Sequence, residues 1–536
     1  MTPYEPSAAP DVPRTLGAIL RRQSADHPGS EFLVFPDRSW TYAAFDAWVD
    51  RIACGLAARG IGKGTKVAIM LPNCSEFVGV WFACARIGAV EVPVNVNVRG
   101  QLLGHILRQS DAAMLVAHAS HLDDIGAVLD DLPCLSTVIS VGGGRFGPAF
   151  AGLQTGPFAD LDIAGATPPE VELSPDDPAA IIFTSGTTGP SKGAVLSHTY
   201  FWWFGERCCQ LRGMAEDECL YTCLPLFHAN AQALTVMPAL LRGRKAVLDT
   251  HFTASGFWDR MRTFGATQFN YIGGMIPILM KQPPDAGDRD HRVRLALGAA
   301  APPNQWRAFE DRFGLRIMEC YGQTEDCAVT ANPVEDARIG SIGKPVWGYQ
   351  MQVVDDAGQV LPDGETGEFV VRPEKPGILM KGYYRMPEET LAVFDDLWFH
   401  TGDFGWRDAD GYFYFVDRKK DALRRRGENI SAYEVELAIN EHPAILESAV
   451  YAVPSDVGED DVMVAAILKP GQTLTEAELI EHCQGRLAYF AVPRFVVFRA
   501  ELPKTPTHRI EKYKLRQEGV TPDTWDREAA GIVLRR

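Results

Sequence analysis

Short runs of small and branched apolar residues alternate with longer segments of helical character through residue 350. Residues 66–71 (Lys-Val-Ala-Ile-Met-Leu) predict a strand, residues 76–87 predict a helix packed beside it, and Gly88 is the expected break before an apolar run at 89–96. Similar apolar runs occur at 113–117, 179–183, 245–248 and 294–297. This rhythm is typical of α/β layers with mainly parallel strands.

The pattern changes near Gly340, where apolar runs alternate with turn sequences such as Asp363-Gly364 and Asp410-Gly411. The runs lie at 351–354, 367–371 and 411–416 and predict a β-rich subdomain. Beyond a basic stretch at 417–427, helices are expected at 433–441 and 475–487, and strands at 448–453 and 462–468.

These patterns predict an α/β protein with a large body and a small second domain. Residues 1–418 are expected to form the body, from two layered α/β subdomains and the β-rich subdomain. Residues 419–536 are expected to form a small α+β domain. The length of 536 residues, taken alone, suggests three or four domains.

The composition narrows the classes of function. The chain has 52 Lys and Arg against 69 Asp and Glu, a net charge of −17, so a nucleic-acid partner is not expected. No uncharged apolar run reaches the roughly 18 residues of a membrane helix, and the N-terminal residues do not resemble a signal peptide. The 11 cysteines are scattered and none has zinc-ligand spacing, which indicates a reducing, cytoplasmic location.

The strongest local motif follows the apolar run at 179–183. The loop up to residue 193 contains glycines at 186, 189 and 193, hydroxyl side chains at 184, 185, 187 and 188, and Lys192. Glycines let backbone N–H groups approach an anion, hydroxyls donate to phosphate oxygens, and a lysine neutralises charge. The spacing is not that of a Walker A loop. The alternative is a polar turn after a strand, which this density of glycines and hydroxyls disfavours.

Residues 184–193 (Thr-Ser-Gly-Thr-Thr-Gly-Pro-Ser-Lys-Gly) resemble the phosphate loop of the adenylate-forming superfamily, which includes acyl-CoA synthetases, luciferases and peptide-synthetase adenylation domains. Residues 321–325 (Tyr-Gly-Gln-Thr-Glu) are similar to its acyl-adenylate motif. The resemblance implies that Tyr321 stacks on adenine, that Thr324 contacts phosphate, and that Glu325 holds Mg²⁺, for which a carboxylate oxygen is a suitable ligand. Without the resemblance, this pentapeptide predicts a turn with capping residues equally well.

Thr401-Gly-Asp403 matches the ribose-binding aspartate of the superfamily, and a carboxylate is suited to accept hydrogen bonds from a 2′,3′-diol. Arg418 falls where the superfamily has a nucleotide-contacting arginine, and Lys420 falls at the hinge of its mobile C-terminal domain. The alternative for the basic stretch is a solvated face, which suits Arg424 to Arg426.

Leu226-Phe-His228 resembles the element that borders the carboxylate pocket, so His228 is expected to gate the acyl tunnel. The resemblance places residues 271–275 and 297–302 at the pocket wall, where small residues suggest room for a medium-chain, aromatic or polycyclic acyl group. Periodicity alone predicts tight helix–strand packing there. A diterpenoid acid of secondary metabolism, as in platensimycin- or platencin-like pathways, is one candidate substrate.

Residues 427–431 (Gly-Glu-Asn-Ile-Ser) resemble the loop that swings in for the second half-reaction and lines the pantetheine channel, and they are most similar to crotonobetaine/carnitine-type acyl-CoA ligases. The resemblance thus implies four groups of site residues. The nucleotide site comprises Thr184, Ser185, Gly186, Thr187, Thr188, Gly189, Lys192, Gly298, Ala299, Ala300, Tyr321, Gly322, Gln323, Thr324, Asp403 and Arg418. The acyl pocket comprises His228, Tyr271, Gly273, Gly274, Gly298 and Gly322. The CoA channel comprises Gly427, Glu428 and Asn429. Thr184 and Glu325 are the metal ligands, and Thr184, Lys192, Glu325 and Arg509 are the catalytic residues.

The C-terminal motif departs from the superfamily pattern. The superfamily has Pro-Lys-Thr-x-x-Gly-Lys-Ile, whose last lysine bridges the attacking carboxylate and the α-phosphate, whereas residues 503–510 are Pro-Lys-Thr-Pro-Thr-His-Arg-Ile. His508 thus stands at the glycine position and Arg509 at the catalytic lysine position. A guanidinium keeps the charge but not the compact shape of an ammonium, so adenylation is expected to be weakened. Lys512 and Lys514 are nearby cations that could compensate.

The favoured interpretation is an acyl-CoA ligase that uses ATP, Mg²⁺ and CoA and forms an acyl-AMP intermediate. The first alternative is an enzyme that takes preformed acyl-AMP from a separate adenylating enzyme and transfers the acyl group to CoA. The second is a non-catalytic acyl- or nucleotide-binding regulator, against which Lys192, Glu325 and Asp403 argue. A stand-alone adenylation domain for a carrier protein is a further alternative. The expected partners are a small-molecule carboxylic acid or its acyl-adenylate, and CoA, with no nucleic acid and no membrane span.

Overall fold

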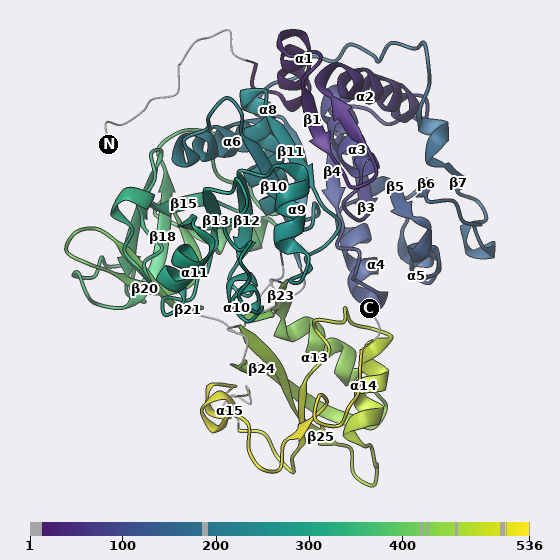
Figure 1. Cartoon of the computed structure of the whole chain (residues 1–536). Helices are drawn as coiled ribbons and strands as arrows, with labels where there is room; N and C mark the ends of the chain where they lie inside the picture. Colours follow the sequence, from purple (N-terminus) through teal and green to yellow (C-terminus); the bar gives the residue numbers. More distant parts are fainter. Residues whose placement is uncertain are drawn as a thin grey trace. The chain divides into compact units, whose positions relative to one another are not determined.

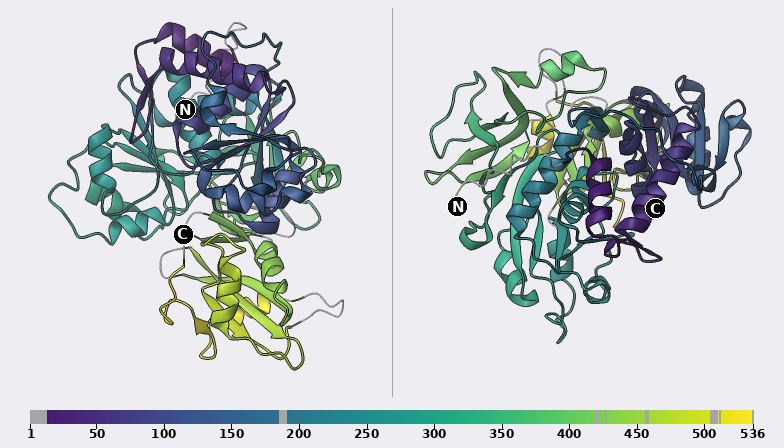
Figure 2. Two further views of the ribbon diagram at one scale, coloured as in Figure 1. Left: turned by 90° about the vertical axis from the view of Figure 1, so that its right-hand side faces the viewer. Right: turned by 90° about the horizontal axis from the view of Figure 1, so that it is seen from above.

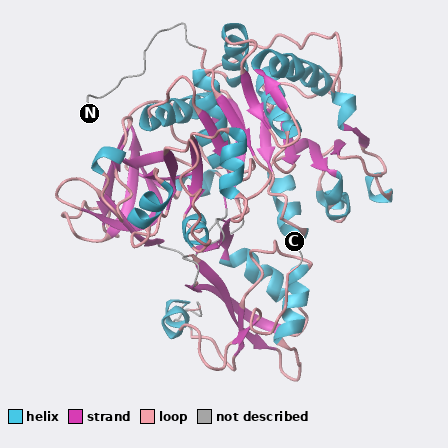
Figure 3. Cartoon of the chain, in the orientation of Figure 1, coloured by secondary structure: helices cyan, strands magenta, loops and turns pink. Residues whose placement is uncertain are grey.

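The computed structural model describes residues 13–184, 191–418, 422–425, 428–455, 459–503, 510 and 512–534 (Figure 1). The chain divides into two compact units. Unit 1 contains the described residues of Met1–Val96, Leu107–Phe183 and Gly193–Asp417, and unit 2 contains those of Asn97–Ile106, Thr184–Lys192 and Arg418–Arg536. Figure 3 distinguishes the helices and strands of both units by colour.

Unit 1 contains a nine-stranded sheet with the strand order β16-β15-β14-β13-β12-β10-β11-β1-β2. Its strands are β1 (Glu31–Val34), β2 (Ser39–Thr41), β10 (Cys219–Thr222), β11 (Lys245–Leu248), β12 (Gln268–Ile272), β13 (Leu295–Ala299), β14 (Arg316–Gln323), β15 (Cys327–Asn332) and β16 (Lys344–Pro345). The neighbours from β14 to β1 pair in parallel, and the pairings of β2, β15 and β16 are antiparallel. Nearly every residue of β10 and β13 is buried, as expected for parallel strands that are covered on both faces.

A second, seven-stranded sheet has the order β7-β6-β5-β3-β4-β8-β9. Its strands are β3 (Lys66–Met70), β4 (Val90–Pro93), β5 (Ala112–His118), β6 (Thr137–Val141), β7 (Gln154–Pro157), β8 (Pro178–Thr184) and β9 (Lys192–Ser197). The pairs β3–β4, β3–β5, β4–β8, β5–β6 and β6–β7 are parallel. Each apolar run predicted as a strand in this part of the chain coincides with a strand, so the predicted α/β class with mainly parallel strands is confirmed.

Helices connect these strands. They are α1 (Leu16–Asp26), α2 (Tyr42–Ala57), α3 (Ser75–Ile87), α4 (Gly100–Gln109), α5 (Leu122–Gly126), α6 (His198–Arg212), α7 (Ala229–Ala231), α8 (Met237–Arg242), α9 (Phe257–Phe264), α10 (Met275–Met280), α11 (Trp306–Phe313) and α12 (Pro387–Leu391), with a π-helix at Gln232–Val236. Five 3₁₀ turns lie at Ala119–His121, Leu129–Asp131, Pro148–Phe150, Phe158–Leu161 and Val334–Asp336. Helices α1, α2 and α3 pack against one another, as the purple helices of Figure 2 show. The break predicted at Gly88 is confirmed, because Gly88 ends α3 with a φ of 72°.

The β-rich subdomain of unit 1 is a five-stranded antiparallel sheet of β17 (Tyr349–Val354), β18 (Gly367–Pro373), β19 (Phe394–Asp395), β20 (Trp398–Arg407) and β21 (Phe413–Arg418). The three predicted runs coincide with β17, β18 and β21. The sequence pattern missed β20 as a strand, although this strand carries the Thr401-Gly-Asp403 motif.

The turn between β19 and β20 holds a leucine in the left-handed region. Asp396 and Leu397 have φ values of 45° and 66°, and Leu397 is 73% exposed. A leucine pays about 1–2 kcal/mol for this conformation, whereas glycine adopts it without a Cβ clash. We therefore expect Leu397→Gly to raise the free energy of unfolding by about 1 kcal/mol in urea denaturation, net of the extra entropy of glycine in the unfolded chain. Leu397→Ala keeps the Cβ and should give no gain; an equal gain in both variants would contradict the expectation.

His198, the first residue of α6, gives the stability of unit 1 a defined pH dependence. It is fully buried, and the backbone N–H of Leu16 donates to its Nδ1 at 3.4 Å. Burial lowers its pKa to about 4, opposed by Asp177 and reinforced by Lys63. As the pH falls, His198 takes up a proton near pH 6.5 in the unfolded chain but only near pH 4 in the folded chain. Its contribution to the free energy of unfolding is therefore complete above pH 6.5 and is lost as the pH falls to 4.

The full loss is expected to be about 3 kcal/mol, of which about 2 kcal/mol falls between pH 7 and pH 4.5. Urea denaturation of the wild type and of His198→Gln at pH 7 and pH 4.5 checks it. The glutamine of the variant keeps an acceptor near the N–H of Leu16 but has no group that titrates between pH 7 and pH 4.5. The free energy of unfolding of the variant should therefore decrease less between these two pH values than that of the wild type. The same decrease in both proteins would refute the assignment.

Unit 2 contains a four-stranded sheet of the order β24-β25-β26-β27 and a two-stranded sheet of β22 and β23. Its elements after residue 418 are β22 (Ala422–Arg425), β23 (Glu428–Ser431), α13 (Ala432–Asn440), β24 (Ile445–Pro454), β25 (Asp460–Leu468), α14 (Glu476–Gln484), β26 (Phe495–Phe498), α15 (Lys512–Glu518) and β27 (Trp525–Asp526). The two helices and two strands predicted here are confirmed, and α14 begins with a capping box of Thr475 and Glu478. No helix in the described ranges is long and apolar enough to cross a membrane.

One basic residue of unit 2 is not solvated, contrary to the interpretation of Arg424 to Arg426 as an exposed face. Arg425 is 4% exposed, and its Nε lies 2.9 Å from Oδ1 of Asp461. Arg494 pairs with the other oxygen of Asp461 at 2.8 Å. The interpretation is therefore wrong for Arg425, whose charge joins β22 to β25; a buried guanidinium needs such a partner.

Candidate functional site

The carboxyl ends of three neighbouring parallel strands bring together residues predicted for the acyl and nucleotide sites. β12 ends just after Tyr271, β13 ends just after Gly298, and β14 contains Tyr321 and Gly322 near its end. The register pairs Tyr271 with Gly298, and Gly298 with Glu319. Ligand crevices of open parallel sheets lie outside this end of the strands. The predicted residues thus share the edge of the sheet where a ligand is expected.

The glycines at this edge are explained by close backbone packing. A Cβ on Gly273 would lie 2.3 Å from the carbonyl oxygen of Ala300, one on Gly298 would lie 2.1 Å from that of Tyr271, and one on Gly322 would lie 1.5 Å from that of Cys327. Real Cβ atoms do not approach so closely, so only glycine fits. Their small size therefore carries no information on the size of the acyl group.

Glu319, which the sequence analysis missed, holds the end of β13 in place. Its carboxylate accepts hydrogen bonds from the backbone N–H groups of Ala300 and Ala301, the latter at 3.1 Å, and from the hydroxyl of Tyr271. Ala300 has a φ of 64°, which is uncommon outside glycine. Glu319 is 5% exposed and compensates the strained turn with charge-assisted hydrogen bonds. The signal in the sequence was a lone acidic residue inside an apolar strand.

The predicted ribose end is a hydrogen-bonded cluster between β14 and β20. The hydroxyl of Tyr321 and the side-chain amide of Gln323 both donate to Oδ2 of Asp403, each at 2.8 Å. The amide of Gln323 also donates to the carbonyl oxygen of Thr401 at 2.8 Å. Burial raises the pKa of Tyr321 well above its usual value, so the phenol stays protonated as a donor. Residues 80 positions apart in the sequence are thereby fixed to one carboxylate.

Glu325 and Thr324 are held by two tyrosines from distant segments. The hydroxyl of Tyr383 donates to Oε1 of Glu325 at 2.9 Å, and the hydroxyl of Tyr200 donates to the carbonyl oxygen of Thr324 at 2.7 Å. The backbone N–H of Met380 donates to the carbonyl oxygen of Glu325 at 2.7 Å. Glu325 is 6% exposed, so its carboxylate has a defined position.

The motif at 321–325 is also a capped turn. The backbone N–H of Gln323 donates to Oδ1 of Asp326 at 2.6 Å. Asp326 is fully buried, and burial raises the pKa of its carboxyl group well above the usual value. The two interpretations of this pentapeptide are therefore compatible, with Asp326 as the residue that closes the turn.

His228 lies at the start of α7, at the end of a loop that is clamped from a distance. Asn73 donates to the carbonyl oxygens of Leu224 at 3.0 Å and Asp249 at 2.7 Å, and accepts from the N–H of Leu226 at 2.8 Å. The ring of His228 is half-buried and makes an edge contact with Phe227. Asn73, missed by the sequence analysis, thus fixes the backbone that presents His228.

The described ends of the predicted phosphate loop are Thr184 in β8 and Lys192 in β9, joined by a 3.4 Å hydrogen bond from the Thr184 hydroxyl to the Lys192 carbonyl. Within unit 2, the hydroxyl of Ser191 donates to Glu434, and burial raises the pKa of that carboxyl group to about 7. Arg418 ends β21, and Glu428 and Asn429 lie in β23. The predicted residues Ser185, Gly186, Thr187, Thr188, Gly189, Lys420, Gly427, His508 and Arg509 lie outside the described residues.

Comparison with known proteins identifies the family of the chain. A family model described as AMP-binding enzyme matches residues 20–384, and one described as AMP-binding enzyme C-terminal domain matches residues 434–509. Crotonobetaine/carnitine–CoA ligase of Salmonella typhi is 34% identical over 491 residues, which cover 89% of this chain and 93% of the relative. The chain belongs to the adenylate-forming acyl-CoA ligases. The predicted superfamily and enzyme class are thereby confirmed.

Solved structures of similar ligases have the same fold. The o-succinylbenzoate CoA synthetase of Bacillus subtilis, as a double mutant, has a TM-score of 0.81 at 24% identity and covers 93% of this chain and 98% of its own. The anthranilate CoA ligase in complex with anthranoyl-AMP has a TM-score of 0.70 at 27% identity and covers 98% of this chain and 100% of its own. The predicted large α/β N-terminal part and small C-terminal domain are thus those of the adenylate-forming fold.

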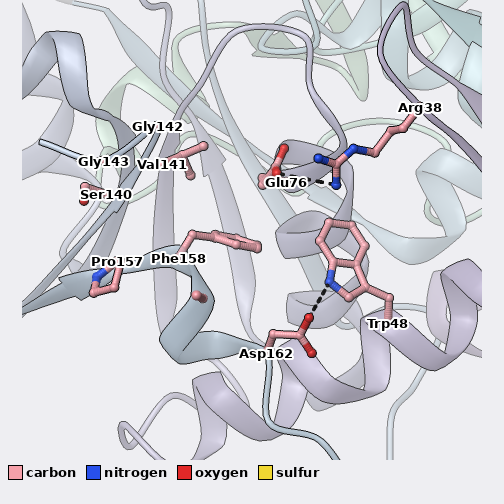
Figure 4. Close-up of a pocket in the computed structure, with 11 residues that line it drawn as sticks. Arg38, Trp48, Glu76, Ser140, Val141, Gly142, Gly143, Pro157, Phe158 and Asp162 are labelled. Atoms are coloured by element: carbon pink, nitrogen blue, oxygen red, sulfur yellow. Dashed lines mark hydrogen bonds and ion pairs between the residues drawn. The ribbon is translucent and has the colours of Figure 1, made fainter.

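The ligase also has an open pocket of about 390 Å³ in unit 1 (Figure 4). Its described lining includes Trp48, Phe158, Arg38 and the backbone of Gly142 and Gly143. Figure 4 shows the indole of Trp48 donating to the carboxylate of Asp162, at 3.2 Å. No residue predicted for the nucleotide, acyl or CoA sites is among its described lining.

Proposed function

We propose that this ligase activates a carboxylic acid as acyl-AMP and then transfers the acyl group to CoA, with adenylation weakened by Arg509. The observation that carries the nucleotide part is the cluster of Tyr321, Gln323 and Asp403 beside Glu325 at the carboxyl end of the sheet. Asp403 is the acceptor for the ribose hydroxyls, and Tyr321 offers its ring to adenine. The turn at Ala299 and Ala300 borders the same ligand.

The phosphates of ATP are the ligands that we assign to the loop at 184–193. Its hydroxyls, its glycine N–H groups and Lys192 suit three adjacent anionic groups. Glu325 and Thr184 fit a magnesium site, because Mg²⁺ prefers oxygen ligands and takes only one or two from protein, the others coming from water and phosphates. When bound, Mg²⁺ would supply charge neutralisation to the phosphates. The hydroxyl of Tyr383 orients the carboxylate of Glu325 for this role.

The weakened first half-reaction is proposed from the sequence of the last motif. An arginine in place of the bridging lysine keeps a positive charge, but that charge is spread over a planar guanidinium group instead of being concentrated on one ammonium group. Lys512 is an imperfect substitute, because its Nζ lies 2.6 Å from Oε1 of Glu436, an ion pair that joins α15 to α13 within unit 2. Lys514 is exposed.

We assign CoA as the acyl acceptor of the second half-reaction, and residues 427–429 as the lining of the channel for its pantetheine arm. We propose residues 1–418 and 419–536 as the two domains and Lys420 as the hinge, so that one site serves both half-reactions by rotation. A second candidate function follows from Arg509 alone: an enzyme supplied with acyl-AMP by a separate adenylating enzyme.

The experiment that tests the proposal compares two reactions of the same enzyme. One contains a panel of aliphatic and aromatic acids with ATP, Mg²⁺ and CoA, and the other contains the corresponding acyl-AMPs with CoA. We expect thioester from both and a rate at least 10-fold higher from acyl-AMP. Absence of thioester from every acyl-AMP contradicts CoA transfer, and equal rates contradict weakened adenylation. Thioester from acyl-AMP alone establishes the second candidate.

A further inference from the structure

A buried arginine of the ligase makes its described side-chain hydrogen bonds to neutral amides, while the carboxylate of Glu218 acts on its charge without forming an ion pair with it. Arg212 is the last residue of α6 and is 2% exposed. Its guanidinium donates to Oδ1 of Asn270 at 2.6 Å and to Oε1 of Gln268 at 3.4 Å. The negative end of the α6 dipole compensates part of its charge. A buried charge without a directly paired carboxylate is costly, and such groups are found at functional sites.

This arginine fixes the direction of a chain of hydrogen bonds. A guanidinium has donors and no acceptor, so Asn270 must turn its oxygen toward Arg212 and its NH₂ group away. That NH₂ group donates to Oδ1 of Asn230 at 3.0 Å and to Oγ1 of Thr235 at 2.8 Å. Asn230 therefore uses its oxygen toward Asn270 and presents its own NH₂ group on the opposite side. The donor-only guanidinium at one end therefore sets the direction of both amides.

The chain leads from the core toward the predicted acyl pocket. Arg212, Asn270 and Thr235 are 2% exposed or less, whereas Asn230 is half-buried. Asn230 lies two residues after His228, and it is this neighbour that places the end of the chain near the predicted pocket, since Asn270 and Tyr271 point to opposite faces of β12. A π-helix at Gln232–Val236 begins two residues after Asn230, and such helices are frequent at functional sites.

We propose that the NH₂ group of Asn230 donates a hydrogen bond to the acyl group, so that Asn230 selects acids carrying an uncharged or anionic oxygen acceptor beyond the carboxylate and rejects cationic ones. Arg212 is the positioning residue, acting through Asn270. This inference rests on the proposed function, because it assigns a specificity to the acyl pocket. It differs from what the name of the crotonobetaine/carnitine relatives suggests, since both of those acids carry a quaternary ammonium group.

The test measures kcat/KM for CoA-thioester formation with acids matched in length, with ATP and also from the corresponding acyl-AMPs. The pairs are 4-oxopentanoate with pentanoate and 5-oxohexanoate with hexanoate, and 4-(trimethylammonio)butanoate is the cationic probe. In the wild type we expect each oxo acid to exceed its hydrocarbon partner by 10- to 100-fold, the value of one hydrogen bond in a desolvated pocket. The cation should be the poorest substrate.

Asn230→Leu should reduce the oxo-to-hydrocarbon ratio to about 1. Asn230→Asp replaces the donor by an anionic acceptor of the same shape, so it should improve the ratio of the cation to pentanoate at least 10-fold. Asn304→Asp, an exposed residue, introduces the same charge and should leave the ratios unchanged. Arg212→Met should lower the preference for oxo acids, because the amides of Asn270 and Asn230 are then free to turn either way. Arg212→Lys keeps a donor and a charge, so it should retain more of this preference than Arg212→Met does. If Arg212 only stabilised the fold, its loss would lower the rates with both kinds of acid and leave the oxo-to-hydrocarbon ratio unchanged.

A wild-type ratio near 1, or an unaltered ratio in Asn230→Leu, overturns the inference while leaving the ligase function intact. A wild type that converts the hydrocarbon acids and none of the oxo acids also overturns it. Failure of the proposed function is recognised separately, as absence of thioester from all acids and all acyl-AMPs.

Discussion

The double variant His508→Gly with Arg509→Lys is expected to exchange pyrophosphate into ATP about 10²–10³ times faster than the wild type, in the presence of a substrate acid. The lysine restores a compact charge that bridges the acid carboxylate and the α-phosphate, and the glycine restores backbone freedom beside it. Only the adenylation half-reaction uses this charge in the proposed mechanism. The measurement is acid-dependent ATP–pyrophosphate exchange.

Three controls separate this effect from a general improvement. Arg509→Lys alone should give part of the gain, and Arg509→Ala should lower exchange below the wild type because it removes the remaining charge. The rate of thioester formation from preformed acyl-AMP and CoA should stay within about 3-fold in all variants. If the wild type already exchanges as fast as the double variant, Arg509 performs the role of the lysine and the weakened adenylation is refuted.

The fold was predictable where the periodicity of the chain is local. The run at 245–248 coincides with β11, and the helix at 76–87 lies within α3 with its glycine break. In such segments burial on both faces of a sheet, or a single glycine in the left-handed region, decides the structure. The short strands β26 and β27 were missed because they have only four and two residues and depend on pairing with β25 and with each other.

The side chains that hold the candidate site were not predictable, because their partners come from distant segments. Tyr383 is 58 residues from Glu325, and Asn73 is about 150 residues from the loop that it clamps. Neither residue lies in a recognised motif, and the sequence around each of them does not mark it as part of a site. These residues lie in loops, and the packing of distant segments against one another, rather than the sequence around each residue, creates these contacts. Arg212 is a similar case, since its burial follows only from the packing around the end of α6.

Glu319→Gln is expected to be the most damaging conservative substitution at the nucleotide end of the site. The wild-type carboxylate accepts from the N–H groups of Ala300 and Ala301 and from the hydroxyl of Tyr271. A glutamine has one oxygen, so its NH₂ group must face one of these donors and leave it unsatisfied. Loss of a charged acceptor and one buried unsatisfied donor together cost about 3–5 kcal/mol. The strained turn at Ala300 is then expected to relax away from the position that we propose for the nucleotide.

We therefore expect Glu319→Gln to lower the midpoint of thermal unfolding by several degrees and to raise the Kd for ATP at least 10-fold, measured by calorimetry at a temperature where the variant is folded. Tyr271→Phe is the matched control, because it removes one donor and leaves the carboxylate and both N–H groups paired. It should cost only about 1 kcal/mol and change the Kd for ATP by less than about 3-fold. If Tyr271→Phe weakens ATP binding as much as Glu319→Gln does, the effect comes from the tyrosine contact and not from the turn. If Glu319→Gln binds ATP normally, the turn at Ala299 and Ala300 is not part of the nucleotide site.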